Sequence, residues 1–63
     1  MTLFTLFKYM DLDSQIEIYD RDCNLIEKGT RGSIDLPDKV YDFKVYSFIP
    51  GIVTMIYLDI ILT

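Results

Sequence analysis

The sequence predicts a single α+β domain over residues 1–63, with a four-stranded, mainly antiparallel sheet made of two hairpins. An N-terminal helix and a short helical turn between the hairpins complete the predicted fold. Three observations lead to this prediction: a helical period of apolar residues at the N-terminus, later segments with strand-like patterns, and turn-forming residues between them. A chain of 63 residues has room for one small core.

The segment Thr2–Met10 has the pattern of one short helix. Thr2 is suited to cap its N-terminus. A strand is the alternative, because the segment also contains mediocre helix formers. The apolar residues at positions i, i+3, i+4 and i+7 share one helical face: Leu3, Leu6, Phe7 and Met10.

The first hairpin is predicted from an alternating segment followed by a turn. Gln15–Asp20 places Ile16 and Ile18 on one face and its polar residues and Tyr19 on the other, as in a half-buried strand. Arg21–Asn24 is rich in turn-forming residues, and Leu25–Lys28 follows as the second strand.

The connecting segment Thr30–Asp42 is polar and contains one helical turn. Asp35 or Leu36 would cap this turn, and Pro37 would occupy an early position, where its missing N–H costs nothing. We expect Val40 and Tyr41 to attach the turn to the sheet.

The second hairpin joins Phe43–Ile49 to Ile52–Leu62 through the turn at Pro50-Gly51. The last strand is apolar on both faces, so it is expected to lie at the centre of the sheet or to be covered on each side. Its second face could be covered by another part of the same chain or could contact a partner or a second copy. We predict self-association through this face, most simply in a symmetric homodimer. That face carries Val53, Met55, Tyr57 and Ile61.

The charge balance argues against direct nucleic-acid binding. Ten acidic and six basic residues give a net charge of −4, and the basic residues are scattered singly among acids, whereas phosphate neutralisation needs them clustered. This acidity would suit a basic surface of another protein, and it would equally suit solubility. The acidic residues proposed to face such a partner are Glu17, Asp20, Asp22, Glu27, Asp35, Asp38 and Asp42.

The residue types also predict where the protein works. Cys23 is the only cysteine, so no intrachain disulfide is possible and a reducing cytoplasm is expected. No signal-peptide pattern is visible at the N-terminus. The apolar stretch Gly51–Leu62 is interrupted by Asp59 and is shorter than the ~20 residues that a membrane-spanning helix needs, so no membrane association is expected.

No pattern in the sequence predicts an enzyme, a metal or a cofactor. Histidine is absent and Cys23 has no base beside it, which excludes the usual nucleophile pairs and zinc sites. The start Asp20-x-Asp22-x-Asn24 resembles a calcium loop, but Leu25 and Arg31 stand where that loop needs Gly and Glu.

The loop that contains Arg31, Gly32 and Ser33 could hold a small anion, although an ordinary connection explains it better.

The run Ile16–Thr30, preceded by the short Leu-rich helix and followed by Lys44-Val45-Tyr46-Ser47, resembles short proteins of phages and mobile elements of Gram-positive bacteria. Those proteins usually have Gly where Cys23 stands here. The resemblance implies the hairpin fold and a host-cell cytoplasm. Small acidic proteins of such elements include inhibitors of bacterial defence nucleases, the anti-CRISPR type.

Three hypotheses follow for function. The first is a non-enzymatic accessory protein that binds another protein, for example as an inhibitor of a host nuclease. The second is a binder of a small nucleotide or anion, which uses the Arg31 loop across a homodimer. The third is a structural or regulatory protein whose role is assembly.

Overall fold

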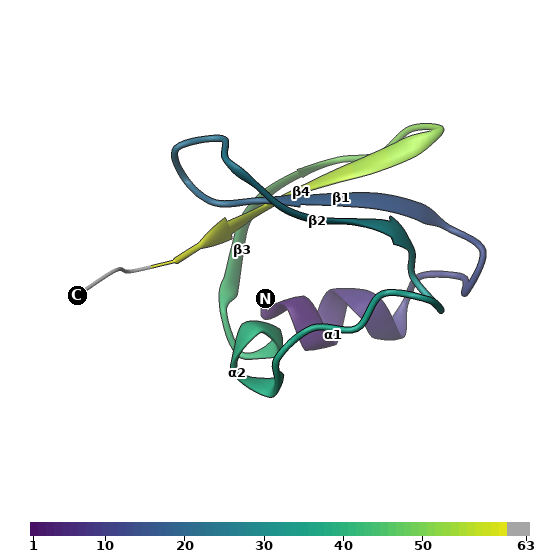
Figure 1. Ribbon diagram of the computed structural model, residues 1–63, viewed down its shortest axis with the longest axis horizontal. Helices are drawn as coiled ribbons and strands as arrows, with labels where there is room; N and C mark the ends of the chain where they lie inside the picture. The colour runs from purple at the N-terminus through teal and green to yellow at the C-terminus, as the bar shows by residue number, and fades with distance from the viewer. Residues whose placement is uncertain (61–63) are drawn as a thin grey trace.

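Four strands form one sheet, and two short helices lie on one side of it (Figure 1). The computed structural model describes residues 1–60. The strands are β1 (Gln15–Tyr19), β2 (Leu25–Thr30), β3 (Lys44–Ile49) and β4 (Val53–Asp59), and the helices are α1 (Leu3–Lys8) and α2 (Asp38–Tyr41). The predicted α+β class, the four strands and the two short helical elements are therefore confirmed.

Helix α1 forms as its apolar period predicts. The side chain of Thr2 accepts a hydrogen bond from the Thr5 N–H at 3.2 Å and so caps the N-terminus. The helix ends at Lys8, two residues before the predicted end, and the alternative of a strand here is wrong. Within residues 1–60 no helix has the length and apolar character that crossing a membrane requires.

Helix α2 is a single turn that begins slightly later than predicted. Pro37 is its N-cap residue and Asp38 its first helical residue. Val40 is buried in the core that the sheet residues also form, and Tyr41 packs partly against it, so the turn is attached to the sheet through this shared core. The ring of Tyr41 meets the Phe7 ring edge-to-face at 5.8 Å, which joins α2 to α1.

The strand order is β2-β1-β4-β3. Both hairpins are antiparallel, as predicted, but the two central strands β1 and β4 pair in parallel. The prediction of a mainly antiparallel sheet is thus correct for the outer pairs only, and the sheet is mixed. The connection 31–43 carries the chain from one edge of the sheet to the other, and the second hairpin then returns toward β1. A parallel pair needs such a long crossover.

The core lies between the sheet and the helical layer. From the sheet it takes Ile16, Ile18, Ile56 and Leu58, all at 1% exposure or less. Strand β4 is central, as its two apolar faces predict. The helical layer and the connection contribute Leu3, Leu6, Phe7, Leu36 and Val40.

Candidate functional site

The face of the sheet that points away from the helices is the candidate site, and we call it the outer face. Successive side chains of a strand point to opposite sides. Since Ile16 and Ile18 of β1 and Ile56 of β4 fill the core, the residues between them must lie on the outer face. Both helices and the connection lie on the other side (Figure 1), so no element within residues 1–60 covers the outer face.

Three tyrosines from three strands meet on the outer face, and we call them the tyrosine cluster: Tyr19, Tyr46 and Tyr57. Tyr19 and Tyr57 are register partners in the parallel pair of β1 and β4, and their rings stack at 5.3 Å with 21° between the planes. Tyr46 lies 6.0 Å from the Tyr57 ring. It reaches this side at an irregularity in β3 between Val45 and Ser47, where a bulge re-aims a side chain.

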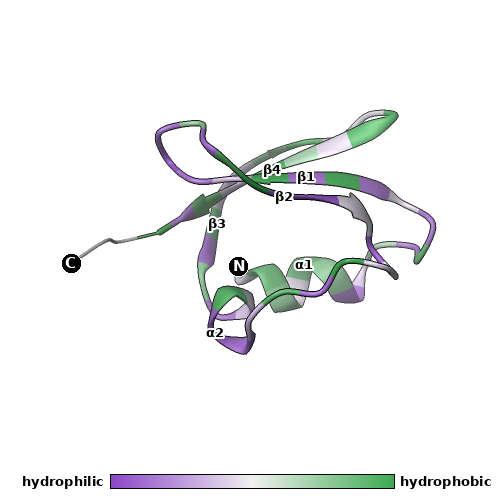
Figure 2. Cartoon of the chain, in the orientation of Figure 1, coloured by the Kyte–Doolittle hydropathy of each residue, from purple (hydrophilic) through white to green (hydrophobic). Residues whose placement is uncertain are grey.

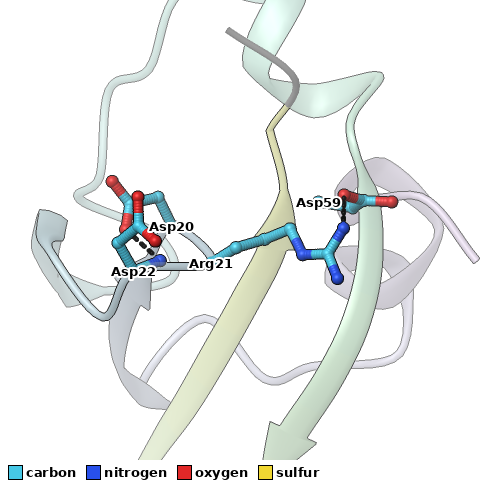
Figure 3. Close-up of polar contacts among 4 residues, drawn as sticks. All are labelled: Asp20, Arg21, Asp22 and Asp59. Carbon is cyan, nitrogen blue, oxygen red and sulfur yellow. Dashed lines mark hydrogen bonds and ion pairs between the residues drawn. The ribbon is translucent and has the colours of Figure 1, made fainter.

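Arg21 lies against the edge of the tyrosine cluster. Its guanidinium carbon is 5.4 Å from the centre of the Tyr46 ring, and its Nη1 pairs with Asp59 Oδ1 at 3.1 Å (Figure 3). The side chains are 62% and 31% exposed, so the ion pair contributes at most about 1 kcal/mol to stability. Its main effect is to hold a planar cation beside an aromatic ring.

Glu17 completes the outer face on β1. The Tyr19 hydroxyl donates a hydrogen bond of 2.6 Å to Glu17 Oε1. This hydrogen bond to a carboxylate raises the pKa of Tyr19, because losing the proton would leave two negative groups in contact. The pair fixes the orientation of the Tyr19 ring within the cluster.

The turn between β1 and β2 is organised by Asp20. Its carboxylate accepts a hydrogen bond of 2.9 Å from the backbone N–H of Asp22 (Figure 3). It also accepts from the backbone N–H of Asn24 at 2.9 Å and from Asn24 Nδ2 at 3.2 Å. These bonds, above all the one from the Asn24 backbone, lower the pKa of Asp20. Cys23 follows with a φ of 64°, in the left-handed region that favours glycine.

The calcium-like start of this segment is thus a turn whose first carboxylate is bound to its own backbone. Within residues 1–60, no group of three or more His, Cys, Asp or Glu side chains is placed to hold a metal ion. Cys23 is exposed at the tip of the turn.

The predicted acidic residues do not form one face. Glu17 is on the outer face, and Asp20 and Asp22 are in the adjoining turn. Glu27 lies on edge strand β2, where its carboxylate accepts the Lys28 N–H. The others lie in the connection and in or beside α2, on the helical side of the sheet (Figure 1): Asp35, Asp38 and Asp42.

The residues predicted for self-association share one side, as expected. Val53, Met55 and Tyr57 lie on the outer face of β4, and each is half-buried. Ile61 lies outside the described residues. This strand therefore presents the apolar centre of the outer face, between Tyr19 on β1 and Ile49 on β3.

The loop predicted for an anion is tied to its own chain. The backbone N–H groups of Arg31, Gly32 and Ser33 donate to the carbonyls of Ser14, Leu12 and Thr30. Arg31 Nε donates to the Phe7 carbonyl at 3.1 Å, near the end of α1. The loop borders a groove of about 610 Å³ whose lining carries both signs of charge: Lys8, Arg31, Asp38 and Asp42.

The chain matches no protein-family model, no curated protein and no solved structure. The candidate site therefore rests on the geometry of the outer face. Sequence reasoning named Tyr57 and Glu17 and placed Asp59 on the same strand face as Tyr57, but it missed Tyr46 and Arg21 as parts of this surface and the pairing of Arg21 with Asp59. The only sequence signal for Tyr46 and Arg21 was their residue type, because Tyr and Arg are enriched at protein interfaces.

Proposed function

We propose that this chain is a non-enzymatic protein-binding domain whose partner docks on the outer face around the tyrosine cluster. The observation that carries the proposal is the joining of three tyrosines and Arg21 on a sheet face that no element within residues 1–60 covers. Tyr and Arg are the residue types that most often carry the binding energy of protein interfaces. A tyrosine contributes large apolar area together with a hydroxyl that can find a partner.

A protein fits this surface better than a nucleic acid does. Aromatic side chains on a sheet face also stack on bases in single-strand binding proteins. Here, however, Glu17 and Asp59 border the cluster, and Asp59 already pairs with the nearby cation, Arg21. With a net charge of −4 in addition, the surface would repel phosphates.

The same charges indicate the kind of protein partner. Asp20 and Asp22 flank Arg21 in the turn, and the Arg21 side chain extends from this turn to Asp59 (Figure 3). The turn follows β1 and Asp59 ends the parallel strand β4, so these acids lie at the same end of the two central strands. Acids at the rim of an apolar contact favour a basic surface and speed association with it. Because the sequence resembles phage and mobile-element proteins, a bacterial nuclease with a basic groove is the partner we propose, with the chain acting as its inhibitor in the host cytoplasm.

Capture from a lysate of a Gram-positive bacterium tests this function. The immobilised baits are the natural chain, Tyr46→Ser and Tyr9→Ser. Tyr46 and Tyr9 are 48% and 82% exposed, but Tyr9 lies at the end of α1, away from the outer face. The two variants therefore make the same chemical change on different surfaces.

We expect a protein, identified by mass spectrometry, to be retained by the natural chain and by Tyr9→Ser and to be lost with Tyr46→Ser. Loss with Tyr9→Ser alone would place the interface on the helical side and contradict the proposal. A nucleotide that co-purifies in place of a protein would favour the second hypothesis drawn from the sequence.

A further inference from the structure

The two edges of the sheet differ in how they are protected against pairing with another strand. Edge strand β2 carries Glu27 and Lys28, and charged residues on an edge discourage the addition of a strand. The first part of β3 is covered by the N-terminal residues, because Thr2 bridges Lys44 and the Val45 N–H donates to the Met1 carbonyl at 2.8 Å.

The second part of β3, Tyr46–Ile49, has neither protection. No charged residue occurs between Lys44 and Asp59. Phe48 and Ile49 are 44% and 52% exposed, and Figure 2 shows the tip of the β3–β4 hairpin coloured as hydrophobic. An uncharged, exposed edge of this kind is a template for strand pairing.

The register shows which backbone groups on this edge are free to pair. In an antiparallel ladder, residues whose N–H and C=O point toward the neighbouring strand alternate with residues whose groups point away. Val45, opposite Leu58, points its N–H away from β4 toward Met1. Phe48 is opposite Ile56, two residues along β4 from Leu58, so its N–H and C=O also point away from β4.

We propose that a second copy of this chain pairs with this edge, β3 against β3 in antiparallel orientation, with the twofold axis at Phe48. The N–H and C=O of Phe48 then bond to those of Phe48 in the second copy. Ser47 lies opposite Ile49 of the second copy, and Tyr46 opposite its Pro50. The two four-stranded sheets become one continuous sheet, and the outer face stays open. This assembly goes beyond the proposed binding of another protein.

Charge favours a second copy at this edge over the other possible contacts. Two copies with a net charge of −4 repel each other over most of their surface, but the stretch between Lys44 and Asp59 brings no charges together. Packing of two outer faces would instead bring Glu17 and Asp59 of both copies close. A basic partner would find no carboxylate on Tyr46–Ile49 to bind.

Light scattering on the purified protein at high micromolar concentration tests this assembly. The natural chain should show twice the mass of one chain. Phe48→Pro removes the N–H that points away from β4, a position that tolerates proline on an edge strand, and it should show the mass of one chain. Phe48→Val keeps the N–H and should remain dimeric. Circular dichroism verifies that both variants fold.

Disulfide trapping gives a second measurement that does not depend on proline. In a Cys23→Ser background, Phe48→Cys should cross-link two copies on oxidation, because Cα atoms of such a pair are about 5.5 Å apart. Ser47→Cys should not, since its two Cα atoms would be about 8 Å apart. A natural chain that stays monomeric, a folded Phe48→Pro that stays dimeric, or equal cross-linking by both cysteine variants would overturn the proposal.

Discussion

Tyr19 and Tyr57 stack across the parallel central pair of the sheet, with their ring centres 5.3 Å apart and 21° between their planes. Aromatic pairs of this kind stabilise a fold by about 0.5–1.5 kcal/mol beyond the area they bury. The pair joins the two hairpins on the outer face, where the helices lend no support. It therefore contributes both to the fold and to the shape of the proposed interface.

A double-mutant cycle should reveal this coupling. We expect Tyr19→Leu and Tyr57→Leu to be non-additive, with a coupling of about 1 kcal/mol in the free energy of unfolding measured with urea. Tyr9→Leu combined with Tyr57→Leu is the control and should be additive, because Tyr9 lies at the end of α1. Additive effects in the first cycle would mean that the stacking contributes nothing to stability.

Replacement of Cys23 by glycine should stabilise the domain. A non-glycine residue at a φ of 64° costs about 1–2 kcal/mol, which glycine avoids at a smaller entropic cost. We expect Cys23→Gly to raise the free energy of unfolding by about 0.5–1 kcal/mol and the β-branched Cys23→Val to lower it. Cys23→Ser controls for the loss of the thiol and should change little. Destabilisation by glycine would show that the turn does not adopt this conformation in solution.

Asp20 should make the stability of the fold fall at acidic pH. Its hydrogen bonds lower its pKa in the folded protein below the ordinary value of 3.8. The ionised carboxylate thus stabilises the fold above this value, and the contribution is lost as the pH falls through it toward the lowered pKa. We expect the Tm of the natural chain to fall more steeply than that of Asp20→Asn between neutral pH and about pH 2.

Asp22→Asn is the matched control for this experiment. It removes one charge from the same turn but leaves the acceptor of the three hydrogen bonds in place. This variant should keep the steep acid dependence. If Asp20→Asn and Asp22→Asn behave alike, general charge repulsion and not the turn explains the acid sensitivity.

Truncation of a side chain in the core should lower the free energy of unfolding far more than truncation of a side chain at the tip of the β3–β4 hairpin. Ile56 is fully buried between β4 and the helical layer, whereas Ile52 is 95% exposed. Ile56→Ala should lower the free energy of unfolding by about 2–5 kcal/mol, a large part of the stability of a domain this small. Ile52→Ala should change it by less than about 0.5 kcal/mol. Urea unfolding of both variants provides the comparison.

Local patterns predicted most of the secondary structure. The spacing of Leu3, Leu6 and Phe7 predicted α1, and the alternation at Ile16 and Ile18 predicted a strand with one buried face; the structure confirms both. These predictions succeed because helix and strand periods are set by the backbone of a single segment. The two apolar faces of Ile52–Leu62 likewise predicted a strand that is central or covered on each side, and the observed strand β4 is central.

The arrangement of these elements was harder to predict, since it depends on contacts between distant segments. The parallel pairing of β1 with β4 follows from the path of the connection 31–43. The local pattern of this connection predicted its helical turn but not the direction in which it crosses the sheet. Tyr46 joins the tyrosine cluster through an irregularity in β3. Asp38 and Asp42 lie apart from the acidic residues of β1 and its turn because α2 lies on the other side of the sheet (Figure 1). The surface around Tyr57 could therefore be foreseen as apolar but not as aromatic.

The central claim, that the outer face is the docking surface, is tested most directly by calorimetric titration of the purified partner with the natural chain, Tyr46→Ser and Tyr9→Ser. Loss of an interface tyrosine that carries much of the binding energy costs about 2 kcal/mol or more, so Tyr46→Ser should bind at least roughly 30-fold more weakly. Tyr9→Ser should bind like the natural chain. Equal affinity of Tyr46→Ser and the natural chain, or an equal loss in both variants, would contradict the claim.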